Sequence, residues 1–383
     1  MGDVGKTYTG LSGKNKEDFG HGEASFVTYM NVYSNPVSDL KMTEPIEIDN
    51  HQNEVKYGDV FFTTSSETPE EVGMASVWTG DKNNTYLNSF CFGYRPLQKI
   101  DPYYLSYLLH SESVRRKIII LAQGISRYNI SKKGVMEIST TFPSLDEQDQ
   151  IGSLFQHIDH TITLHEEKKH QLEQLKSALL QKMFADKNGY PAVRFVGFKN
   201  TWEQCKLGDV TSSYSGGTPT AGTSNYYGGA IPFIRSGEIS KDSTELTITE
   251  EGLNNSAAKL VKRGDILYAL YGATSGEVSI SSLDGAINQA ILAIKPCIGY
   301  DSYLLMSLLK NEKKKIREKF LQGGQGNLSA RIVKNIKLDI PSINEQTEIG
   351  CLLLQLDCTI TLHDRKLELL KRMKQSLLQK MFI

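Results

Sequence analysis

A long internal repeat is the feature that most constrains how this chain of 383 residues can fold. Three segments each return 198 residues further along the chain (341 minus 143, for example), and no gap is needed between them. They are PSLDEQDQIG at Pro143 and PSINEQTEIG at Pro341, DHTITLH at Asp159 and DCTITLH at Asp357, and LLQKMF at Leu179 and Leu377. The chain is therefore built from two copies of one design.

The repeat continues backward as isolated landmarks. Asn129-Ile130-Ser131 matches Asn327-Leu328-Ser329, Gly58-Asp59 matches Gly264-Asp265, and Gly2-Asp3-Val4 matches Gly208-Asp209-Val210. Each half thus has a divergent N-terminal part and a nearly invariant C-terminal part. We predict four parts: a first recognition module (1–142), a first helical spacer (143–187), a second recognition module with an N-terminal arm (188–340) and a second spacer (341–383).

The C-terminal parts of the two halves have the heptad spacing of long amphipathic helices. Their apolar seams are Ile151, Phe155, Ile158, Ile162, Leu172, Leu179 and Met183, and then Ile349, Leu353, Leu356, Ile360, Leu367, Leu370, Leu377 and Met381. About 40 residues at about 1.5 Å each give a rod near 60 Å. Because a globular module separates the two helices in sequence, we expect them to pack antiparallel as a coiled coil.

Polar residues interrupt these seams: His165, Lys169, Lys176, His363 and Lys374. The two histidines could be ligands or pH sensors. We favour the simpler interpretation, in which the polar residues set the register of the coiled coil.

The N-terminal parts of the two halves have the pattern of mixed α/β modules, with short strands and many loops rich in Gly, Ser, Thr, Asn and Tyr. Strands are expected at 231–235, 265–271 and 290–294, and one amphipathic helix at 103–119 and at 303–320. The predicted fold class is α+β: two α/β modules, separated by two long antiparallel helices, in a pseudo-twofold internal repeat.

Composition restricts the possible functions. No segment reaches the roughly 20 apolar residues of a membrane span, and residues 1–13 lack the apolar core of a secretory signal, so a cytoplasmic location is expected. The five cysteines are widely spaced, which argues against disulfides and zinc sites and favours reduced, mostly buried thiols. No metal site is predicted.

The net charge of −1 is low for a nucleic-acid binder, because phosphate contacts normally supply much of the affinity. Basic runs do occur at matching places in the two halves: Arg115, Arg116 and Lys117, then Lys313, Lys314, Lys315, Arg317 and Lys319. Each run could equally be a solvated helix face. A partner protein is therefore expected to supply part of the binding affinity for DNA.

Motifs of common enzymes are absent from the sequence. It contains no phosphate-binding glycine motif, no amino-methyltransferase tetrapeptide (Asn35-Pro36 is followed by Val37), no H-E-x-x-H and no nucleophile elbow. No catalytic residue is predicted. A free-standing methyltransferase or nuclease and a coiled-coil scaffold without a DNA role remain as alternatives.

The loops of the two modules hold the candidate DNA contacts. Gly amides can approach phosphates, and Arg, Asn, Gln and Tyr can read base edges, although such loops are also common as surface turns. The candidates are Lys14, Lys16, Thr64, Ser65, Arg127, Tyr128, Asn129, Ser215, Gly216, Gly217, Thr218, Arg235, Tyr271, Thr274, Gln325 and Asn327. If Arg235 contacts a base, its replacement by Ala should cost about 1–3 kcal/mol of binding and relax one position of the site.

Taken in order, these segments resemble the specificity subunits of type I restriction-modification systems. The resemblance covers essentially the whole chain and includes SGGTPT, IPFIRSGEI, GDILYALYGATSGEVSI, NQAILAI, GGQGNLS and the duplicated helices. It implies that each α/β module is a target recognition domain, which reads one half of a split site in double-stranded DNA. It also implies that the helices set the spacing and dock two modification subunits.

The resemblance also implies which activities lie outside this chain. S-adenosylmethionine and adenine-N6 methylation would belong to the modification subunits. ATP, magnesium and DNA cleavage would belong to restriction subunits. This chain would bind no cofactor itself and would not be catalytic alone.

The sequence departs from the family pattern at its start. The segment VRFVGFKNTWEQCKL (193–207) precedes the second module, but the first module has no counterpart, because Met1 stands where Leu207 would be. Family members usually carry such an arm before the first module as well, so we expect that the chain as given lacks its N-terminal arm.

Overall fold

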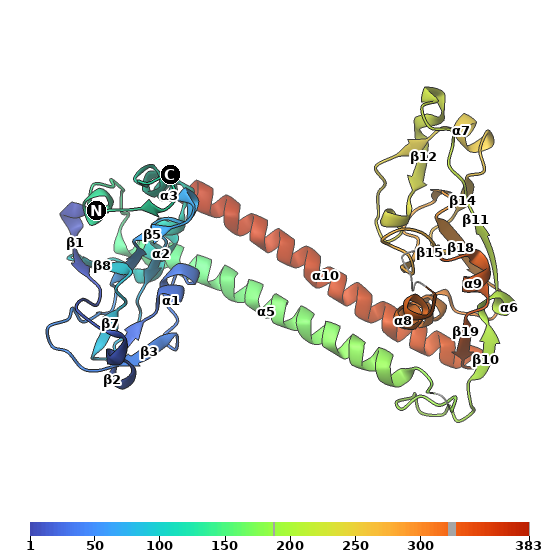
Figure 1. Ribbon diagram of the computed structural model, residues 1–383, viewed down its shortest axis with the longest axis horizontal. Coiled ribbons are helices and arrows are strands. Elements are labelled where there is room, and N and C mark those ends of the chain that lie inside the picture. The colour runs from blue at the N-terminus through green and yellow to red at the C-terminus, as the bar shows by residue number, and fades with distance from the viewer. Residues whose placement is uncertain (187, 321–326, 383) are drawn as a thin grey trace. The chain divides into compact units, whose positions relative to one another are not determined.

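The computed structural model describes residues 1–186, 188–320 and 327–382 and divides the chain into two compact units (Figure 1). Unit 1 comprises Met1–Glu167 and Arg365–Ile383, and unit 2 comprises Lys168–Asp364. Each unit therefore holds one module together with a part of each long helix.

Unit 1 begins with a module of short strands and helices, and α5 leads out of it. Its elements are η1 (Gly2–Val4), β1 (Gly5–Thr9), η2 (Lys16–Asp18), β2 (Phe19–Val27), α1 (Tyr29–Ser34), β3 (Thr43–Ile46), β4 (Val60–Thr63), β5 (Ser65–Ser66), η3 (Pro69–Glu71), β6 (Ala75–Val77), β7 (Thr85–Leu87), β8 (Cys91–Pro96), α2 (Pro102–His110), α3 (Glu112–Ile120), β9 (Tyr128–Asn129), α4 (Lys132–Met136) and α5 (Leu145–Met183).

Unit 2 repeats this order after an additional N-terminal strand, and α10 leads out of it. Its elements are β10 (Glu203–Lys206), α6 (Leu207–Val210), β11 (Thr211–Ser215), η4 (Ser224–Tyr226), β12 (Tyr227–Ile234), η5 (Ser236–Glu238), β13 (Thr247–Ile248), α7 (Glu250–Asn254), β14 (Lys259–Val261), β15 (Ile266–Ala269), β16 (Val278–Ile280), β17 (Gly285–Ile287), β18 (Ile291–Pro296), α8 (Ser302–Phe320), α9 (Ala330–Lys334), β19 (Lys337–Ile340) and α10 (Ile343–Met381).

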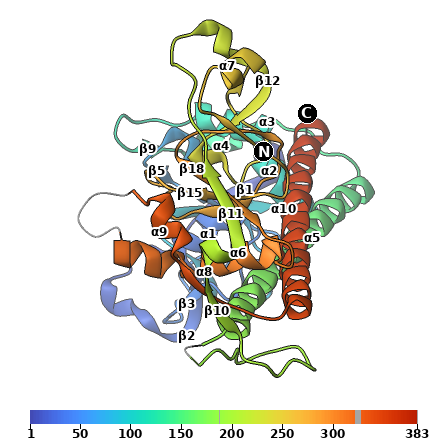
Figure 2. The same cartoon turned by 90° about the vertical axis from the view of Figure 1, so that its right-hand side faces the viewer.

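The two modules share one sheet topology although their sequences have diverged. The order β1-β8-β4-β6 in unit 1 corresponds to β11-β18-β15-β16 in unit 2, whose strands β11, β18 and β15 face the viewer in Figure 2. A second sheet, β3-β2-β7, corresponds to the first three strands of the sheet β13-β12-β17-β14, and the pairs β2–β7 and β12–β17 are both parallel. The repeat read from the helices thus extends over the complete half.

The long helices α5 and α10 have 39 residues each and run antiparallel where they pack. In unit 1, Asp159 pairs with Lys374 and Glu166 with Lys371, so residue numbers rise along one helix as they fall along the other. In unit 2, Lys169 pairs with Asp364 and Lys176 with Asp357 in the same sense. Three of the predicted seam lysines are therefore cross-helix ion-pair partners, as register-setting residues would be.

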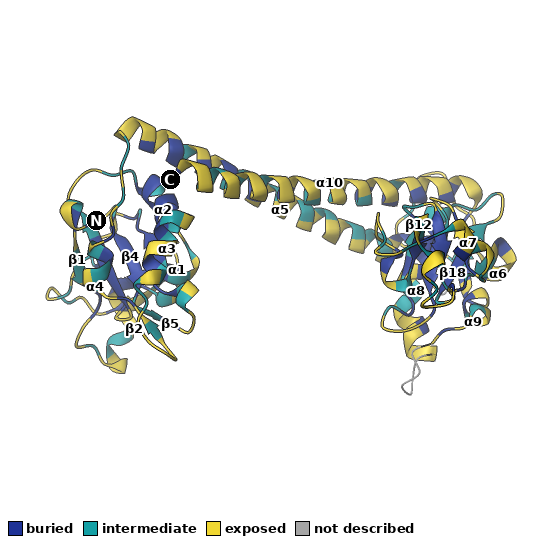
Figure 3. Ribbon diagram, turned by 90° about the horizontal axis from the view of Figure 1, so that it is seen from above, coloured by how far each residue is buried: buried dark blue, intermediate teal, exposed yellow. Residues whose placement is uncertain are grey.

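The predicted apolar seam is largely buried. In unit 1, Ile151, Phe155, Ile158 and Ile162 of α5 join Leu367 of α10 in the core, and Ile349 and Leu353 of α10 do so in unit 2. Much of the remaining surface of α10 is exposed, as the yellow segments in Figure 3 show. One seam assignment is wrong: Met381 is exposed, and the next residue, Phe382, is buried instead.

A single carboxylate ties each module to both long helices. Asp159 of α5 accepts a hydrogen bond from Tyr107 of α2 at 2.8 Å and pairs with Lys374 of α10 at 2.5 Å. The repeat-equivalent Asp357 of α10 accepts one from Tyr303 of α8 and pairs with Lys176 of α5. Burial, and then the bond to the carboxylate, raises the pKa of both tyrosines, so each hydroxyl remains a donor.

A glutamine near the start of each long helix is hydrogen-bonded to the module before it, and we call its two bonds the clasp. Gln148 accepts a hydrogen bond from the Asp101 amide at 3.0 Å and donates one to the Pro143 carbonyl at 2.9 Å. Gln346 makes the same two bonds, with Asp301 and Pro341. Asp101 and Asp301 in turn cap the helices α2 and α8. These bonds explain why the Gln of the PS(L/I)(D/N)EQ segment is repeated.

The repeated glycine inside each long helix allows this close approach. A Cβ atom on Gly152 would lie 2.7 Å from Asp101 Oδ1 and 3.0 Å from the Tyr104 amide nitrogen. A Cβ atom on Gly350 would overlap Asp301 Oδ1 in the same way. Glycine is unfavourable within a helix, so it occurs here because the capping carboxylate occupies the space of a side chain.

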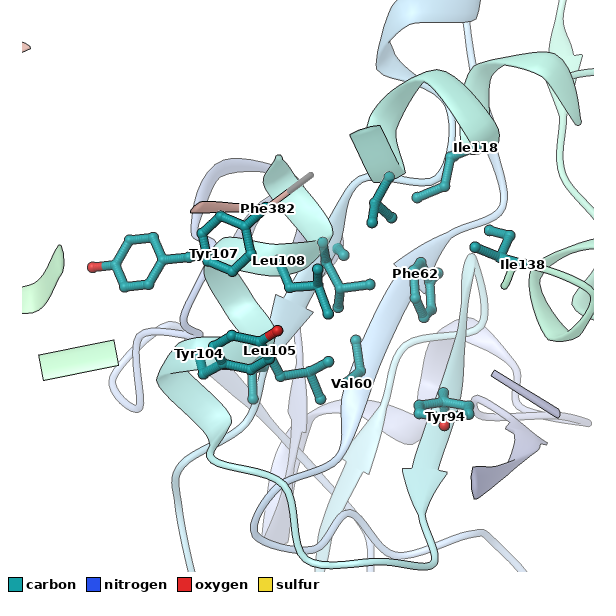
Figure 4. Packing of buried hydrophobic residues seen from close by; sticks show 14 of the residues in the cluster. Val60, Phe62, Tyr94, Tyr104, Leu105, Tyr107, Leu108, Ile118, Ile138 and Phe382 are labelled. Atoms are coloured by element: carbon teal, nitrogen blue, oxygen red, sulfur yellow. The ribbon is translucent and has the colours of Figure 1, made fainter. Parts of the chain in front are cut away.

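The unit 1 core joins the sheet, α2, α3 and both long helices. Figure 4 shows Val60, Phe62 and Tyr94 of the sheet facing Leu105 and Leu108 of α2, with Phe382 alongside. The Phe382 ring lies 5.4 Å from that of Tyr104 and 5.8 Å from that of Phe155, between centroids. The end of α10 is thus part of the core of unit 1.

Two sequence expectations are corrected. The helix expected at 103–119 is split into α2 and α3, because Ser111 has an extended backbone and its hydroxyl caps α3 at Val114. The thiols were expected to be mostly buried, but only Cys91 is buried, whereas Cys297, Cys351 and Cys358 are exposed. All five are free cysteines.

Replacing Gly350 by Ala is predicted to destabilise unit 2 by about 1–3 kcal/mol, because the new methyl group displaces the Asp301 cap. At an ordinary helix position the same change stabilises by up to about 1 kcal/mol, so the sign is diagnostic. The measurement is urea unfolding followed by Trp202 fluorescence in a Trp78→Phe background. The exposed neighbour Cys351→Ala should change stability by less than about 0.5 kcal/mol, and a stabilised Gly350→Ala variant would contradict the clasp.

Candidate nucleic-acid interface

Three loops meet at one edge of the first module. The Ile130 amide donates a hydrogen bond to the Thr64 carbonyl at 3.0 Å, and the Thr64 amide and hydroxyl both donate to the Phe90 carbonyl, at 3.1 and 2.8 Å. The loop after β4, the turn before β8 and the segment before α4 are thereby joined. We call residues 64–65, 89–90 and 127–130 the three-loop junction of this module.

The second module has an equivalent junction. The Leu328 amide donates to the Leu270 carbonyl at 2.7 Å, and the Leu270 amide donates to the Ala290 carbonyl at 2.8 Å. These are the loop after β15, the turn before β18 and the segment before α9. Residues 270–274, 289–290 and 327–328 form this second three-loop junction, built by the same backbone bonds from different side chains.

The first junction brings together five of the predicted contact residues. Ser65 pairs with Asn129 and Ser66 with Tyr128 in the two-stranded sheet β5-β9. Arg127 and Asn129 are exposed, whereas Ser65 and Tyr128 are half-buried. Thr64 is the fifth, and its two donors are used by the Phe90 carbonyl, so it shapes the junction.

The second junction brings together Tyr271, Thr274 and Asn327. Tyr271 is 38% exposed, and Asn327 is exposed as well. The two residues lie near each other because their neighbours Leu270 and Leu328 are joined by a backbone hydrogen bond. Thr218, on the loop after β11, reaches the same place by donating a hydrogen bond to Gln289 at 2.6 Å. The predicted contact Gln325 lies outside the described residues.

The glycine loop 215–218 packs inside the module. A Cβ atom on Gly216 would overlap the Ile287 carbonyl, and one on Gly217 would lie 2.7 Å from the Ala257 carbonyl carbon. Ser215 ends β11 and is half-buried. The glycines are therefore required by close backbone packing, and Thr218 is the member of this loop whose side chain is exposed.

The two predicted lysines of the first module lie on another loop. Lys14 is largely covered and pairs with Asp49 at 2.8 Å, and this bond raises the pKa of Lys14 and lowers that of Asp49. The same loop is held by a reciprocal pair of bonds between Ser12 and Gln52. Lys16 is exposed at the start of η2. Of the two, Lys16 is the more accessible to a ligand.

Arg235 is engaged within the second module. Its guanidinium binds both oxygens of Glu238, each at 3.0 Å, and also contacts Glu245. Glu238 is nearly inaccessible, and the bond to Arg235 holds its pKa at about 2. Glu238 and then Glu245 raise the pKa of Arg235. This arginine therefore organises the turn after β12.

The two basic runs have different surroundings. Arg115 of α3 is bound to the backbone carbonyls of Glu70, Val72 and Gly73, which makes it structural. In α8, side-chain carbons of Lys313 and Arg317 lie next to Gly276 in the loop after β15, and the Lys313 ammonium group pairs with Glu277. The matching positions in the sequence thus serve different purposes.

Sequence reasoning missed three exposed or partly exposed residues at the junctions. Gln289 binds Thr218, Phe90 is 67% exposed beside Thr64, and the Tyr29 hydroxyl donates to the Ser65 carbonyl at 3.2 Å. A signal was present for two of them. Asn88 and Asn288 stand at matching positions two residues before Phe90 and Ala290, and each asparagine side chain accepts a hydrogen bond from that later amide, which shapes the turn that carries Phe90 or Gln289.

A family model for the type I restriction modification DNA specificity domain matches residues 1–174 and 199–372, one copy on each half. This chain belongs to the type I restriction-modification DNA specificity family. The specificity subunit named for the type I restriction enzyme MjaX of Methanocaldococcus jannaschii is 23% identical over 389 residues. The match covers 96% of this chain and 88% of that protein.

Solved structures agree on the fold. The type I restriction-modification S subunit of M. genitalium has a TM-score of 0.64 at 15% identity, and the match covers 100% of this specificity subunit and 94% of that chain. A chain from a study of assembly and conformational transition of the type I restriction-modification system has a TM-score of 0.56 at 18% identity. The match covers 100% of this chain and 96% of that one.

Specificity subunits are generally non-catalytic. Within residues 1–186, 188–320 and 327–382, no group of three or more His, Cys, Asp or Glu side chains could hold a metal ion. Over the same residues, no helix is long and apolar enough to cross a membrane.

Replacing Arg235 by Ala is predicted to lower the stability of unit 2 at pH 7 by about 1–3 kcal/mol, because buried Glu238 loses its partner. Glu238 has a folded pKa of about 2, below its ordinary value of 4.5. Its contribution is therefore complete above pH 4.5 and lost as the pH falls toward 2. The variant should lose this acid dependence in Trp202-monitored unfolding, whereas Glu245→Gln should keep it. An unchanged acid limb in Arg235→Ala would show that the pair is not stabilising.

Proposed function

We propose that each module reads one half of a bipartite site in double-stranded DNA through its three-loop junction. The observation that carries this proposal is that the two junctions share one backbone scaffold and differ in their side chains. Ser65 and Phe90 in the first correspond in place to Tyr271 and Ala290 in the second. Equal frameworks with unequal side chains suit two different half-sites.

The long helices would dock two modification subunits, one on each unit. Exposed apolar side chains recur at repeat-equivalent positions: Leu164 and Met373 in unit 1 correspond to Leu362 and Leu175 in unit 2. Leu164 and Met373 lie two residues from the Glu166–Lys371 pair, so they belong to one stretch of the paired helices. Duplicated apolar positions on a solvent-facing helix pair are typical of a duplicated protein interface.

The chemistry would then reside in the partners. Modification subunits would bind S-adenosylmethionine and methylate adenine N6, and restriction subunits would use ATP and magnesium for translocation and cleavage. This chain would contribute no cofactor and would act in the cytoplasm, where these subunits meet DNA. Arg317, in α8 beside the loop after β15, would contact a phosphate, and the partner would supply further positive charge.

The test is a methylome recorded with the cognate modification subunit in a methylation-free host. A split motif with two short half-sites around a fixed gap is expected. Tyr271→Ala should relax or abolish recognition of one half-site only, and Arg127→Ala the other half-site only, because the two residues lie in different modules. Methylation without a split motif, or both variants affecting the same half, would contradict the assignment of one half-site to each module.

Replacing Leu164 by Asp should remove one modification subunit from the complex, and Leu164→Asp with Leu362→Asp should remove both, because each change places a charge in an apolar contact. The masses of the complexes, measured by light scattering or native mass spectrometry, report the stoichiometry. Gln171→Asp, on an exposed polar position of α5, is the matched control and should leave both subunits bound. Full assembly of the double variant would place the docking surface elsewhere.

A further inference from the structure

Phe90 is an exposed aromatic residue at the three-loop junction of the first module. It lies in the turn of residues 88–90, which joins β7 to β8. Its side chain is 67% exposed, although an aromatic ring stabilises a protein most when it is buried. A single exposed apolar residue is common on protein surfaces, but this one stands on a rigid turn among the candidate DNA contacts.

The backbone on both sides of the Phe90 ring is fixed. The Phe90 amide donates a hydrogen bond to Asn88 Oδ1 at 2.9 Å, and the Phe90 carbonyl accepts two bonds from Thr64, at 3.1 and 2.8 Å. The Asn88 side chain in turn donates to the Val27 carbonyl at 3.1 Å. A Cβ atom on Gly10 would lie 2.0 Å from the Asn88 carbonyl oxygen, so a further loop packs against the turn. A ring held in this way loses little backbone entropy when it contacts a ligand.

The second module has the same turn with a different side chain at this place. Asn288 corresponds to Asn88, and its Oδ1 accepts a hydrogen bond from the Ala290 amide at 3.1 Å. The Ala290 carbonyl accepts a bond from the Leu270 amide at 2.8 Å, as the Phe90 carbonyl accepts one from the loop beside it. Since alanine meets every requirement of the turn, the phenyl ring is not needed to build it.

The chemistry of a phenyl ring restricts what it can read on DNA. The ring carries no hydrogen-bonding group of the kind that distinguishes bases, and the apolar group that base edges present in the major groove is the C5-methyl group of thymine. Ile125, on the loop before α4, is 97% exposed and adds apolar surface near the exposed Arg127. The second module differs here, because its turn carries the exposed amide of Gln289.

We propose that Phe90 is a specificity-determining residue that contacts the methyl group of a thymine in the half-site of the first module. This inference rests on the proposed function and deepens it, because it names one base of that half-site and the contact that selects it. Cytosine would be rejected at this position, since it lacks the methyl group and presents an amino donor to the apolar ring. Uracil would be distinguished from thymine by the methyl group alone.

The probe is a labelled duplex with the split site, bound by the complex of the full chain with its modification subunits. Deoxyuridine replaces each thymine in turn, which removes one methyl group and keeps the base pair. In the half-site that Tyr271→Ala leaves unchanged, one replacement should raise the dissociation constant about fourfold, the effect of losing one buried methyl group. The Phe90→Ala complex should bind the thymine and uracil duplexes equally at that position. All measurements use one salt concentration.

Two controls accompany this measurement. Leu97→Ala removes an apolar side chain that is 65% exposed just beyond the other end of β8, and it should leave the fourfold effect intact. Phe90→Ala should fold as the wild type does, because Ala290 occupies the same place in the second module. Urea unfolding of the variant checks this expectation.

The outcomes separate this inference from the proposed function. A split site at which no replacement in that half-site weakens binding, or at which the effect persists in Phe90→Ala, would overturn the methyl contact alone. A site that is not split would remove the proposed function and the inference together. Fluorescence of 2-aminopurine in that half-site that rises only when Phe90 is present would show insertion of the ring between bases, and it too would overturn the methyl contact.

Discussion

The carboxylates of Asp159 and Asp357 are the contacts on which the architecture of each unit depends. Each one binds a tyrosine of the module helix and a lysine of the facing long helix, so three elements share one charged group. An apolar seam alone tolerates sliding by a turn, because leucines at neighbouring turns are interchangeable in shape. A carboxylate that must meet both a hydroxyl and an ammonium group admits one register. This requirement accounts for the aspartate that begins both copies of the repeated D-x-T-I-T-L-H segment.

The clasps at the starts of the long helices separate the parts of each module whose sequence can vary from the parts whose sequence cannot. Gln148 and Gln346 hold the backbone of the module to the long helix, and Gly152 and Gly350 make room for the capping aspartates. These bonds involve the starts of α2 and α8 and of the long helices, and they leave the β-sheets untouched. The strands and loops can therefore change sequence without altering how a module is seated, which is the property required of a family that keeps its assembly and changes its DNA target.

Under the proposed function, the three-loop junctions would let one framework carry two specificities. Thr64 and Leu270 make the same backbone bonds to the segments beside them, although one side chain is polar and the other apolar. The side chains that follow, Ser65 and Tyr271, then project from equivalent positions with different size and hydrogen-bonding capacity. Backbone bonds do not depend on the side chain, so the junction keeps its shape while its surface chemistry is free to diverge.

The sequence by itself determined the two-fold repetition, the long helices with their seams, the antiparallel arrangement and the family, because periodicity and exact recurrence are local properties of the chain. Its candidates also included Ser65, Arg127, Tyr128 and Asn129, which lie on two separate loops of the sequence and which the structure brings together. Only the tertiary structure decided which charges are engaged: Lys14 faces Asp49 and Arg235 faces Glu238, and these partners are 35 (49 minus 14) and 3 (238 minus 235) residues away. It likewise decided that Ser111 breaks the module helix, that three cysteines are exposed and that Gln289 joins the second junction. Such outcomes depend on which surfaces meet when the strands and helices pack, and no spacing along the chain records that.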